Sequence, residues 1–154
     1  MTPNAKSVSI LMAEDDQDDC LLVKEALKSS RLLNDLYIVG DGEELLDFLK
    51  HRNKYSNPRN APKPGLILLD LNMPRKDGRE ALIEIKSDPE LRRIPLVVLT
   101  TSKEEGDIIK SYDLGANSYI TKPVTFESLV EVIKSLGRYW FEIVELPPNE
   151  GKES

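Results

Sequence analysis

The stretch Leu66-Ile67-Leu68-Leu69-Asp70-Leu71-Asn72-Met73-Pro74 decides how this chain folds. Its first four residues form an apolar run of the kind found in strands of a parallel sheet that is covered on both faces. Asp70 follows the run directly, and removing a carboxylate from water costs considerable free energy unless a partner compensates. We therefore expect Asp70 to lie at the end of a buried strand and to have a chemical role there.

Apolar and amphipathic segments alternate along the rest of the chain. The predicted strands are Val8–Ala13, Leu36–Val39, Leu66–Asp70, Ile94–Thr100 and Ser118–Thr121. The predicted helices are Asp18–Ser30, the segment after Asp41-Gly42 that carries Leu45, Leu46 and Leu49, Lys76–Ser87, Lys103–Leu114, and a fifth that begins after Lys122-Pro123 with Thr125 as its cap. This succession predicts an α/β fold with a doubly wound parallel sheet, whose ligand site lies beyond the carboxyl ends of the strands.

The composition limits the class of protein. With 154 residues, 40% hydrophobic and 31% charged, the chain is expected to form one packed, water-soluble domain. Its formal charge of −6 and its lack of a basic run argue against direct binding of nucleic acid. We find no signal peptide and no apolar stretch of membrane-spanning length, so we expect no membrane association and a cytoplasmic location. The single cysteine, Cys20, is expected to be a packing residue.

Acidic and basic side chains are predicted to meet at one edge of the sheet. Glu14-Asp15 follows the first strand as Asp70 follows the third, and repulsion among carboxylates gathered there favours a hard divalent cation such as Mg²⁺. Thr100 ends the fourth strand and Lys122 follows the fifth, which adds a hydroxyl and an ammonium group. Together these groups suit a tetrahedral anion. The remaining acidic residues of the first stretch are expected to be solvated: Asp16, Asp18 and Asp19.

The order of these motifs resembles the receiver domain of two-component response regulators. The resemblance rests on the acidic pair, on Asp70 within Leu69–Pro74, on Thr100 and on Lys122-Pro123. It implies a (βα)5 flavodoxin-like receiver fold with a parallel sheet of order 2-1-3-4-5. It also implies that residues 1–138 form the receiver domain, including a short N-terminal lead, and that residues 139–154 form a C-terminal extension.

The same resemblance implies roles in phosphoryl chemistry. Asp70 accepts a phosphoryl group from a histidine kinase, and Thr100 and Lys122 contact the phosphoryl oxygens. Thr100 and Tyr119 form the implied switch, and the peptide bond before Pro123 is implied to be cis. Such a protein takes part in its own phosphotransfer and is not a turnover enzyme.

A magnesium site is also implied by the resemblance. The implied ligands are the carboxylates of Asp15 and Asp70, the backbone carbonyl of Asn72 and, through a water molecule, Glu14. A metal ion that bridges a carboxylate and an incoming phosphoryl group neutralises charge and fixes an in-line geometry. Glu14 stands where Asp is also frequent in the family, and its longer side chain favours contact through water.

Two further segments resemble the small stand-alone response regulators of cyanobacterial phytochromes. They are the polar loop His51–Pro64 and the aromatic tail Arg138–Glu142, which is followed by Leu146-Pro147. This resemblance implies a phytochrome histidine kinase as partner. It also implies a homodimer built on the fourth helix, fifth strand and fifth helix, with the tail contributing.

Three other functions compete with the receiver. A phosphatase of the haloacid-dehalogenase type also uses a strand-end Asp and Mg²⁺, but it needs an acid/base Asp two residues later, where this chain has Asn72. A binding module that is not phosphorylated would not need Asp15, Asp70, Thr100 and Lys122 together. An FMN carrier would need a Ser/Thr/Gly-rich phosphate loop after the first strand, and this chain lacks one.

Overall fold

The computed structural model describes residues 9–29 and 35–122 and, beyond these, Glu127, Ser128, Glu131 and Ser135. The strands of this part of the chain are β1 (Ile10–Ala13), β2 (Leu36–Val39), β3 (Leu66–Leu69), β4 (Leu96–Thr100) and β5 (Ser118–Thr121). They form one sheet in the order β2-β1-β3-β4-β5, and neighbouring strands are parallel. The predicted strand order is therefore confirmed.

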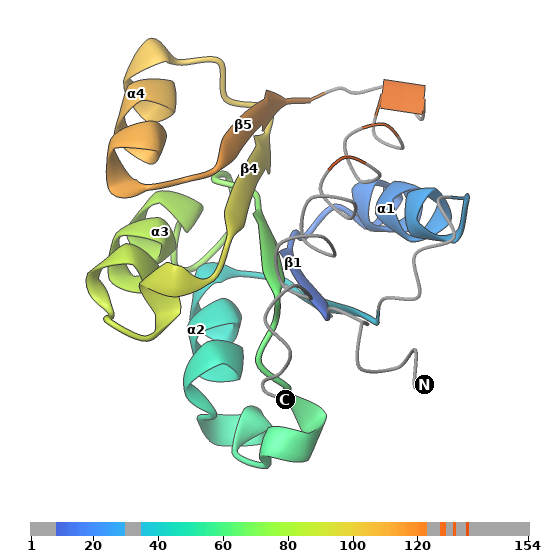
Figure 1. Cartoon of the computed structure of the whole chain (residues 1–154), viewed down its shortest axis with the longest axis vertical. Coiled ribbons are helices and arrows are strands. Elements are labelled where there is room, and N and C mark those ends of the chain that lie inside the picture. Colours follow the sequence, from blue (N-terminus) through green and yellow to red (C-terminus); the bar gives the residue numbers. More distant parts are fainter. Residues whose placement is uncertain (1–8, 30–34, 123–126, 129–130, 132–134, 136–154) are drawn as a thin grey trace, which may run out of the picture.

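Helices cover both faces of this sheet. They are α1 (Gln17–Ser29), α2 (Gly42–Lys50), α3 (Gly78–Ser87) and α4 (Glu105–Leu114). Figure 1 shows α1 on one side of the sheet and α2, α3 and α4 on the other, which confirms the doubly wound α/β architecture. The predicted fifth helix, the Lys122-Pro123 bond and the C-terminal extension lie outside the described residues, except for Glu127, Ser128, Glu131 and Ser135, which are helical.

Short 3-10 helices occur in segments that lie between the predicted helices and strands. Within the described residues they are η2 (Asn53–Tyr55), η3 (Pro58–Asn60) and η4 (Leu91–Arg93). The first two lie inside the polar segment His51–Pro64. The third precedes β4, and the N–H of Ile94 donates to its first carbonyl rather than to the sheet. For this reason β4 begins at Leu96 and not at the predicted Ile94.

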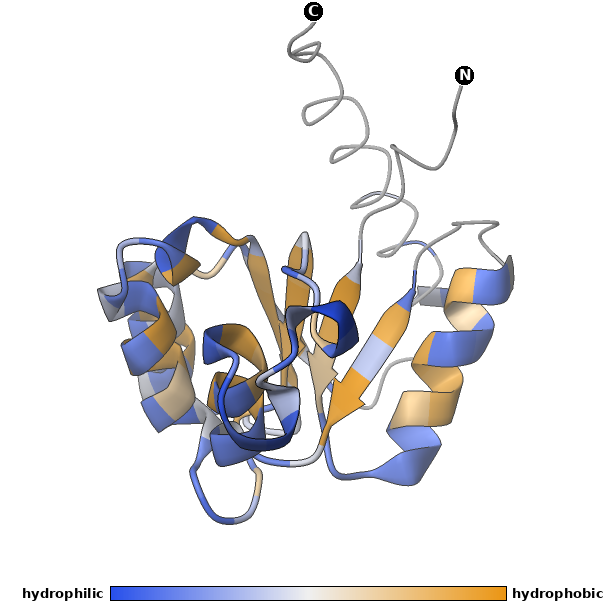
Figure 2. Ribbon diagram, turned by 90° about the horizontal axis from the view of Figure 1, so that it is seen from below, coloured by the Kyte–Doolittle hydropathy of each residue, from blue (hydrophilic) through white to orange (hydrophobic). Residues whose placement is uncertain are grey.

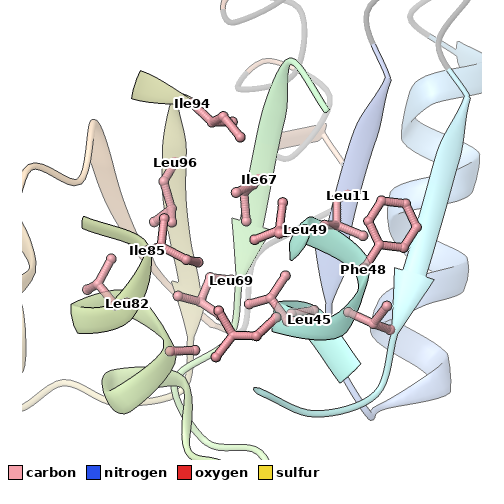
Figure 3. Packing of buried hydrophobic residues seen from close by; sticks show 14 of the residues in the cluster. Leu11, Leu45, Phe48, Leu49, Ile67, Leu69, Leu82, Ile85, Ile94 and Leu96 are labelled. Atoms are coloured by element: carbon pink, nitrogen blue, oxygen red, sulfur yellow. The ribbon is translucent and has the colours of Figure 1, made fainter. Parts of the chain in front are cut away.

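Two hydrophobic clusters fill the space between the sheet and its helices. In β1, Leu11 and Ala13 belong to the cluster that also contains side chains of α2 and α3. Figure 3 shows Leu11 with Leu45, Phe48 and Leu49 of α2. Ile10 and Met12 belong to the second cluster, with α1. Successive side chains of a strand point to opposite faces, so both faces of the sheet are buried. In Figure 2 the strands are largely coloured as hydrophobic, and the helices on either side of them combine hydrophobic and hydrophilic residues.

Cys20 lies in the second cluster and is buried, as predicted for a packing residue. Among the helices of the described segments, none has the length and apolar character needed to traverse a bilayer.

The N-terminus of α3 packs directly against the strand end that carries Asp70. Asp77 caps the helix, and the side chain of Glu80 accepts from the Asp77 N–H in return, so α3 begins at Gly78 rather than at the predicted Lys76. A Cβ atom on Gly78 would lie 2.2 Å from the carbonyl oxygen of Asp70. Only glycine allows this approach, which fixes the backbone around Asp70.

Candidate functional site

Three carboxylates meet beyond the carboxyl ends of β1 and β3. The two strands pair in parallel with Ala13 beside Leu69, so the residues that follow them become neighbours. One oxygen atom from each of Glu14, Asp15 and Asp70 lies within 4.8 Å of the others. Glu14 and Asp70 are 2% and 5% exposed, whereas Asp15 is open to solvent. The structure thus brings together three of the residues singled out from the sequence.

The donor set of this cluster fits a divalent cation. Hard cations take oxygen ligands, and a positive ion relieves the repulsion among neighbouring carboxylates. The N–H of Asn72 donates to Oδ1 of Asp70 over 3.1 Å, so the segment after β3 folds back beside this carboxylate. The exposed side of the cluster, at Asp15, leaves room for a ligand to approach from solvent.

Lys122 supplies a positive charge to the same cluster. Its Nζ lies 2.7 Å from Oε1 of Glu14, 2.6 Å from Oδ2 of Asp19 and 3.6 Å from Oδ2 of Asp70. The backbone N–H of Lys122 donates to the Thr100 carbonyl, which holds the end of β5 beside β4.

The expectation that Asp19 is solvated is therefore wrong, although Asp16 and Asp18 are exposed. Asp19 reaches Lys122 because α1 begins directly after the acidic stretch and its first turn lies against the site. The sequence signal that could have found it is this short distance between the acidic pair and the start of α1.

The pKa values of Glu14 and Lys122 are both raised, but for different physical reasons. Loss of water around Glu14 raises its pKa to about 7, although its hydrogen bond from Lys122 acts to lower it. Burial acts to lower the pKa of Lys122, but its hydrogen bonds to Asp19 and Glu14 outweigh this effect and raise it above the usual value. Lys122 therefore stays charged at neutral pH.

Thr100 and Tyr119 belong to β4 and β5, which lie on the side of β3 away from β1. Thr100 is fully buried at the end of β4, and the side-chain amide of Asn72 donates to its hydroxyl over 3.4 Å and to that of Thr101 over 3.0 Å. The Tyr119 hydroxyl donates to the backbone carbonyl of Ser102 over 3.0 Å. The backbone N–H of Ser102 also donates to the Thr100 hydroxyl over 3.4 Å, so both predicted switch residues contact the segment that connects β4 to α4.

Arg79, which the sequence pattern did not single out, links this segment to Asn72, two residues after the phosphoacceptor candidate. Its guanidinium group forms a bidentate ion pair with Asp107 of α4, at 2.8 and 2.7 Å, and also donates to Oδ1 of Asn72 over 3.3 Å. The Ser102 hydroxyl donates to the same Asp107 carboxylate. The Arg79 and Ser102 hydrogen bonds hold the pKa of Asp107 at about 2.

A parallel sheet of this order, with acidic residues, a buried threonine and a lysine at its carboxyl edge, defines a class of signalling protein. The chain belongs to the response regulator receiver domain family, whose sequence profile matches residues 10–134. Response regulator Rcp1 of Synechocystis sp. is 47% identical over 138 residues, which cover 90% of this chain and 92% of that protein. The probable methanogenesis regulatory protein FilR2 of Methanothrix harundinacea is 35% identical over 131 residues, or 85% of this chain and 82% of that protein.

Solved structures give the same result. The phosphorylated cyanobacterial phytochrome response regulator RcpA has a TM-score of 0.78 and 45% identity, with 89% of this chain and 96% of that chain covered. The Mn(2+)-bound form of response regulator Rcp1 has a TM-score of 0.77 and 46% identity, with 88% and 95% covered. These similarities favour the receiver over the phosphatase alternative.

Proposed function

We propose that this chain accepts a phosphoryl group on Asp70 from a histidine kinase and passes the signal on through protein contacts. The observation that carries the proposal is the environment of the Asp70 carboxylate, which is 5% exposed, 3.6 Å from the Lys122 ammonium and clustered with two further carboxylates. Several carboxylates around one lysine are unfavourable for stability alone, because like charges repel. They suit a site that receives an anionic group together with a divalent cation.

The proposed transfer moves a phosphoryl group between two side chains. A carboxylate oxygen of Asp70 attacks the phosphorus atom, the bond from phosphorus to the kinase histidine nitrogen breaks, and this nitrogen keeps the electron pair. The Lys122 ammonium then pairs with one phosphoryl oxygen, and the Thr100 hydroxyl donates to another. Asn72 carries an amide that cannot shuttle a proton, so the acyl phosphate persists as a signal rather than turning over.

The cation of this site is proposed to be Mg²⁺. The proposed ligands are the carboxylates of Asp15 and Asp70, the backbone carbonyl of Asn72 and, through a water molecule, Glu14. When bound, the ion would neutralise charge between the carboxylate and the phosphoryl group. The Mn(2+)-bound structure of Rcp1, 46% identical to this chain, supports a divalent cation in a related protein.

The proposed partners follow from the relatives and from one exposed surface. RcpA is a cyanobacterial phytochrome response regulator, which supports a phytochrome histidine kinase as the cytoplasmic phosphodonor of this chain. Ile109 and Tyr112 of α4 are 53% and 48% exposed, which supports a homodimer through α4, β5 and the helix that follows. In this proposal residues 1–138 are the receiver, and residues 139–154 are an extension that contributes to the dimer.

The variant Asp70→Asn tests the phosphoacceptor. The purified chain is incubated with Mg²⁺ and acetyl phosphate, and its intact mass is measured. The wild-type chain should gain one phosphoryl group and Asp70→Asn none, because the amide is not a nucleophile of comparable strength. The control Asp18→Asn, which removes an exposed carboxylate near the same edge, should be labelled like the wild type. Undiminished labelling of Asp70→Asn would refute the proposal.

A further inference from the structure

The ammonium of Lys122 is bound on the side of the site that faces α1. Its Nζ lies within hydrogen-bonding distance of Asp19, at 2.6 Å, and of Glu14, at 2.7 Å. Its distance to Oδ2 of Asp70 is 3.6 Å, which is too long for a hydrogen bond. The cation that should pair with a phosphoryl group on Asp70 is therefore engaged elsewhere.

The two carboxylates that engage Lys122 differ in burial. The side chain of Glu14 is 1% exposed, so it cannot regain water if the cation leaves. The side chain of Asp19 is 29% exposed and can be hydrated again at little cost. When Lys122 moves toward a new anion, the bond to Asp19 is the one that opens.

The backbone of α1 places Asp19 in this position. Oδ1 of Asp16 accepts hydrogen bonds from the N–H groups of Asp18 and Asp19, at 2.9 and 3.2 Å, and so caps the helix. The next residue, Cys20, is buried against the sheet, which orients the first turn of α1. The contact between Asp19 and Lys122 thus follows from a fixed helix start.

We propose that Asp19 is a positioning residue that competes with the phosphoryl group for Lys122 and holds this cation back from Asp70 in the unphosphorylated protein. This inference rests on the phosphotransfer proposed above. It predicts that the site binds an anion at Asp70 more tightly when Asp19 is neutralised, because Lys122 is then free to pair with that anion. Tighter anion binding would distinguish this positioning role from a purely structural role of Asp19, because loss of a structural contact would damage the site and weaken anion binding.

The experiment measures equilibrium binding of beryllofluoride to the full chain in the presence of Mg²⁺ by ¹⁹F NMR. Beryllofluoride is an anionic mimic of the phosphoryl group in which fluorine atoms replace the oxygen atoms. Asp19→Asn should bind it roughly fivefold more tightly than the wild type, a change typical of a partly exposed ion pair. Asp18→Asn is the matched control, since it removes the same charge from the adjacent, exposed position of the same helix turn. Asp19→Glu, which keeps a carboxylate within reach of Lys122, should stay within about twofold of the wild type.

Each outcome decides between the two proposals. Tighter binding by Asp19→Asn alone supports the competition for Lys122. Equal binding by Asp19→Asn and Asp18→Asn, or weaker binding by Asp19→Asn, overturns it while the phosphoacceptor proposal stands. Failure of the wild type to bind beryllofluoride, with labelling of Asp70 also absent, overturns the proposed function and this inference with it.

Discussion

Arg79 connects the neighbourhood of Asp70 to α4 through one guanidinium group. The group contacts both carboxylate oxygens of Asp107 and the side chain of Asn72, two residues after Asp70. A planar guanidinium forms such bidentate pairs with defined geometry, so the pair fixes the relative orientation of the two side chains and also balances their charges. A displacement of Asn72 on phosphorylation would therefore alter the contact between Arg79 and Asp107 in the first turn of α4.

The ion pair between Arg79 and Asp107 should make a pH-dependent contribution to stability. The folded-state pKa of Asp107 is about 2, below the ordinary 3.8, so folding favours its ionised form. The contribution is therefore present above about pH 4 and is lost as the pH falls toward 2. Because the Arg79 side chain is 36% exposed, we expect solvent to limit it to about 1 kcal/mol.

Urea unfolding of the wild type and Asp107→Asn between pH 2 and 6 checks this expectation. The difference in unfolding free energy should be largest above pH 4 and should be mostly lost near pH 2. The control Asp113→Asn removes an exposed carboxylate from the same helix and should leave stability nearly unchanged. A difference between wild type and Asp107→Asn that did not vary with pH would contradict the assignment.

The site residues differ in how far their positions and contacts could be predicted from the sequence. The positions of Asp70, Thr100 and Lys122 could be predicted because each ends or directly follows a segment that becomes a strand. The partners of Asp19 and Arg79 could not, because Lys122 and Asp107 are distant in sequence and are met only when α1 and α3 dock on the sheet. Side-chain pairing between elements depends on packing that no local pattern encodes.

The junction between β3 and α3 is the element contact that most constrains the site. Gly78 begins α3, and its N–H donates to the carbonyl of Leu71 over 3.0 Å, which closes the segment that carries Asp70 and Asn72. The sequence predicted both elements but placed the start of α3 at Lys76. The cap formed by Asp77 decides the true start.

The substitution Gly78→Ala should destabilise the protein. The added Cβ would lie 2.2 Å from the Asp70 carbonyl oxygen, so α3 or the Asp70 backbone must shift, at a cost of roughly 1–3 kcal/mol. Gly106→Ala is the control, because nothing lies within 4 Å of a Cβ there and alanine favours the helix. Urea unfolding should show a lower free energy of unfolding for Gly78→Ala and no decrease for Gly106→Ala. Equal stability of Gly78→Ala and wild type would show that the junction can relax.

The helices on the two faces of the sheet expose different apolar side chains to a protein partner. On α4, Ile109 and Tyr112 are exposed beside β5, whereas on the opposite layer α1 exposes Leu21. Tyr119 of β5 contacts Ser102 after β4, so a change at Thr100 has a direct path to the α4 surface. We therefore expect the α4 surface, where Ile109 and Tyr112 are exposed, to change on phosphorylation.

Sedimentation of an Ile109→Asp variant tests whether this surface forms the proposed dimer. Ile109 is 53% exposed, and a charge placed at an apolar contact is buried without a partner on association, so the variant should shift toward monomer by roughly tenfold or more in dissociation constant. Leu21→Asp, at a position 57% exposed on α1, makes the same chemical change on the opposite layer and should leave the dimer intact. Because each chain carries a formal charge of −6, added salt should strengthen the wild-type dimer by screening the repulsion between copies. Dissociation caused by Leu21→Asp but not by Ile109→Asp would move the interface to α1, and it would remove the link between the Asp70 site and association through α4.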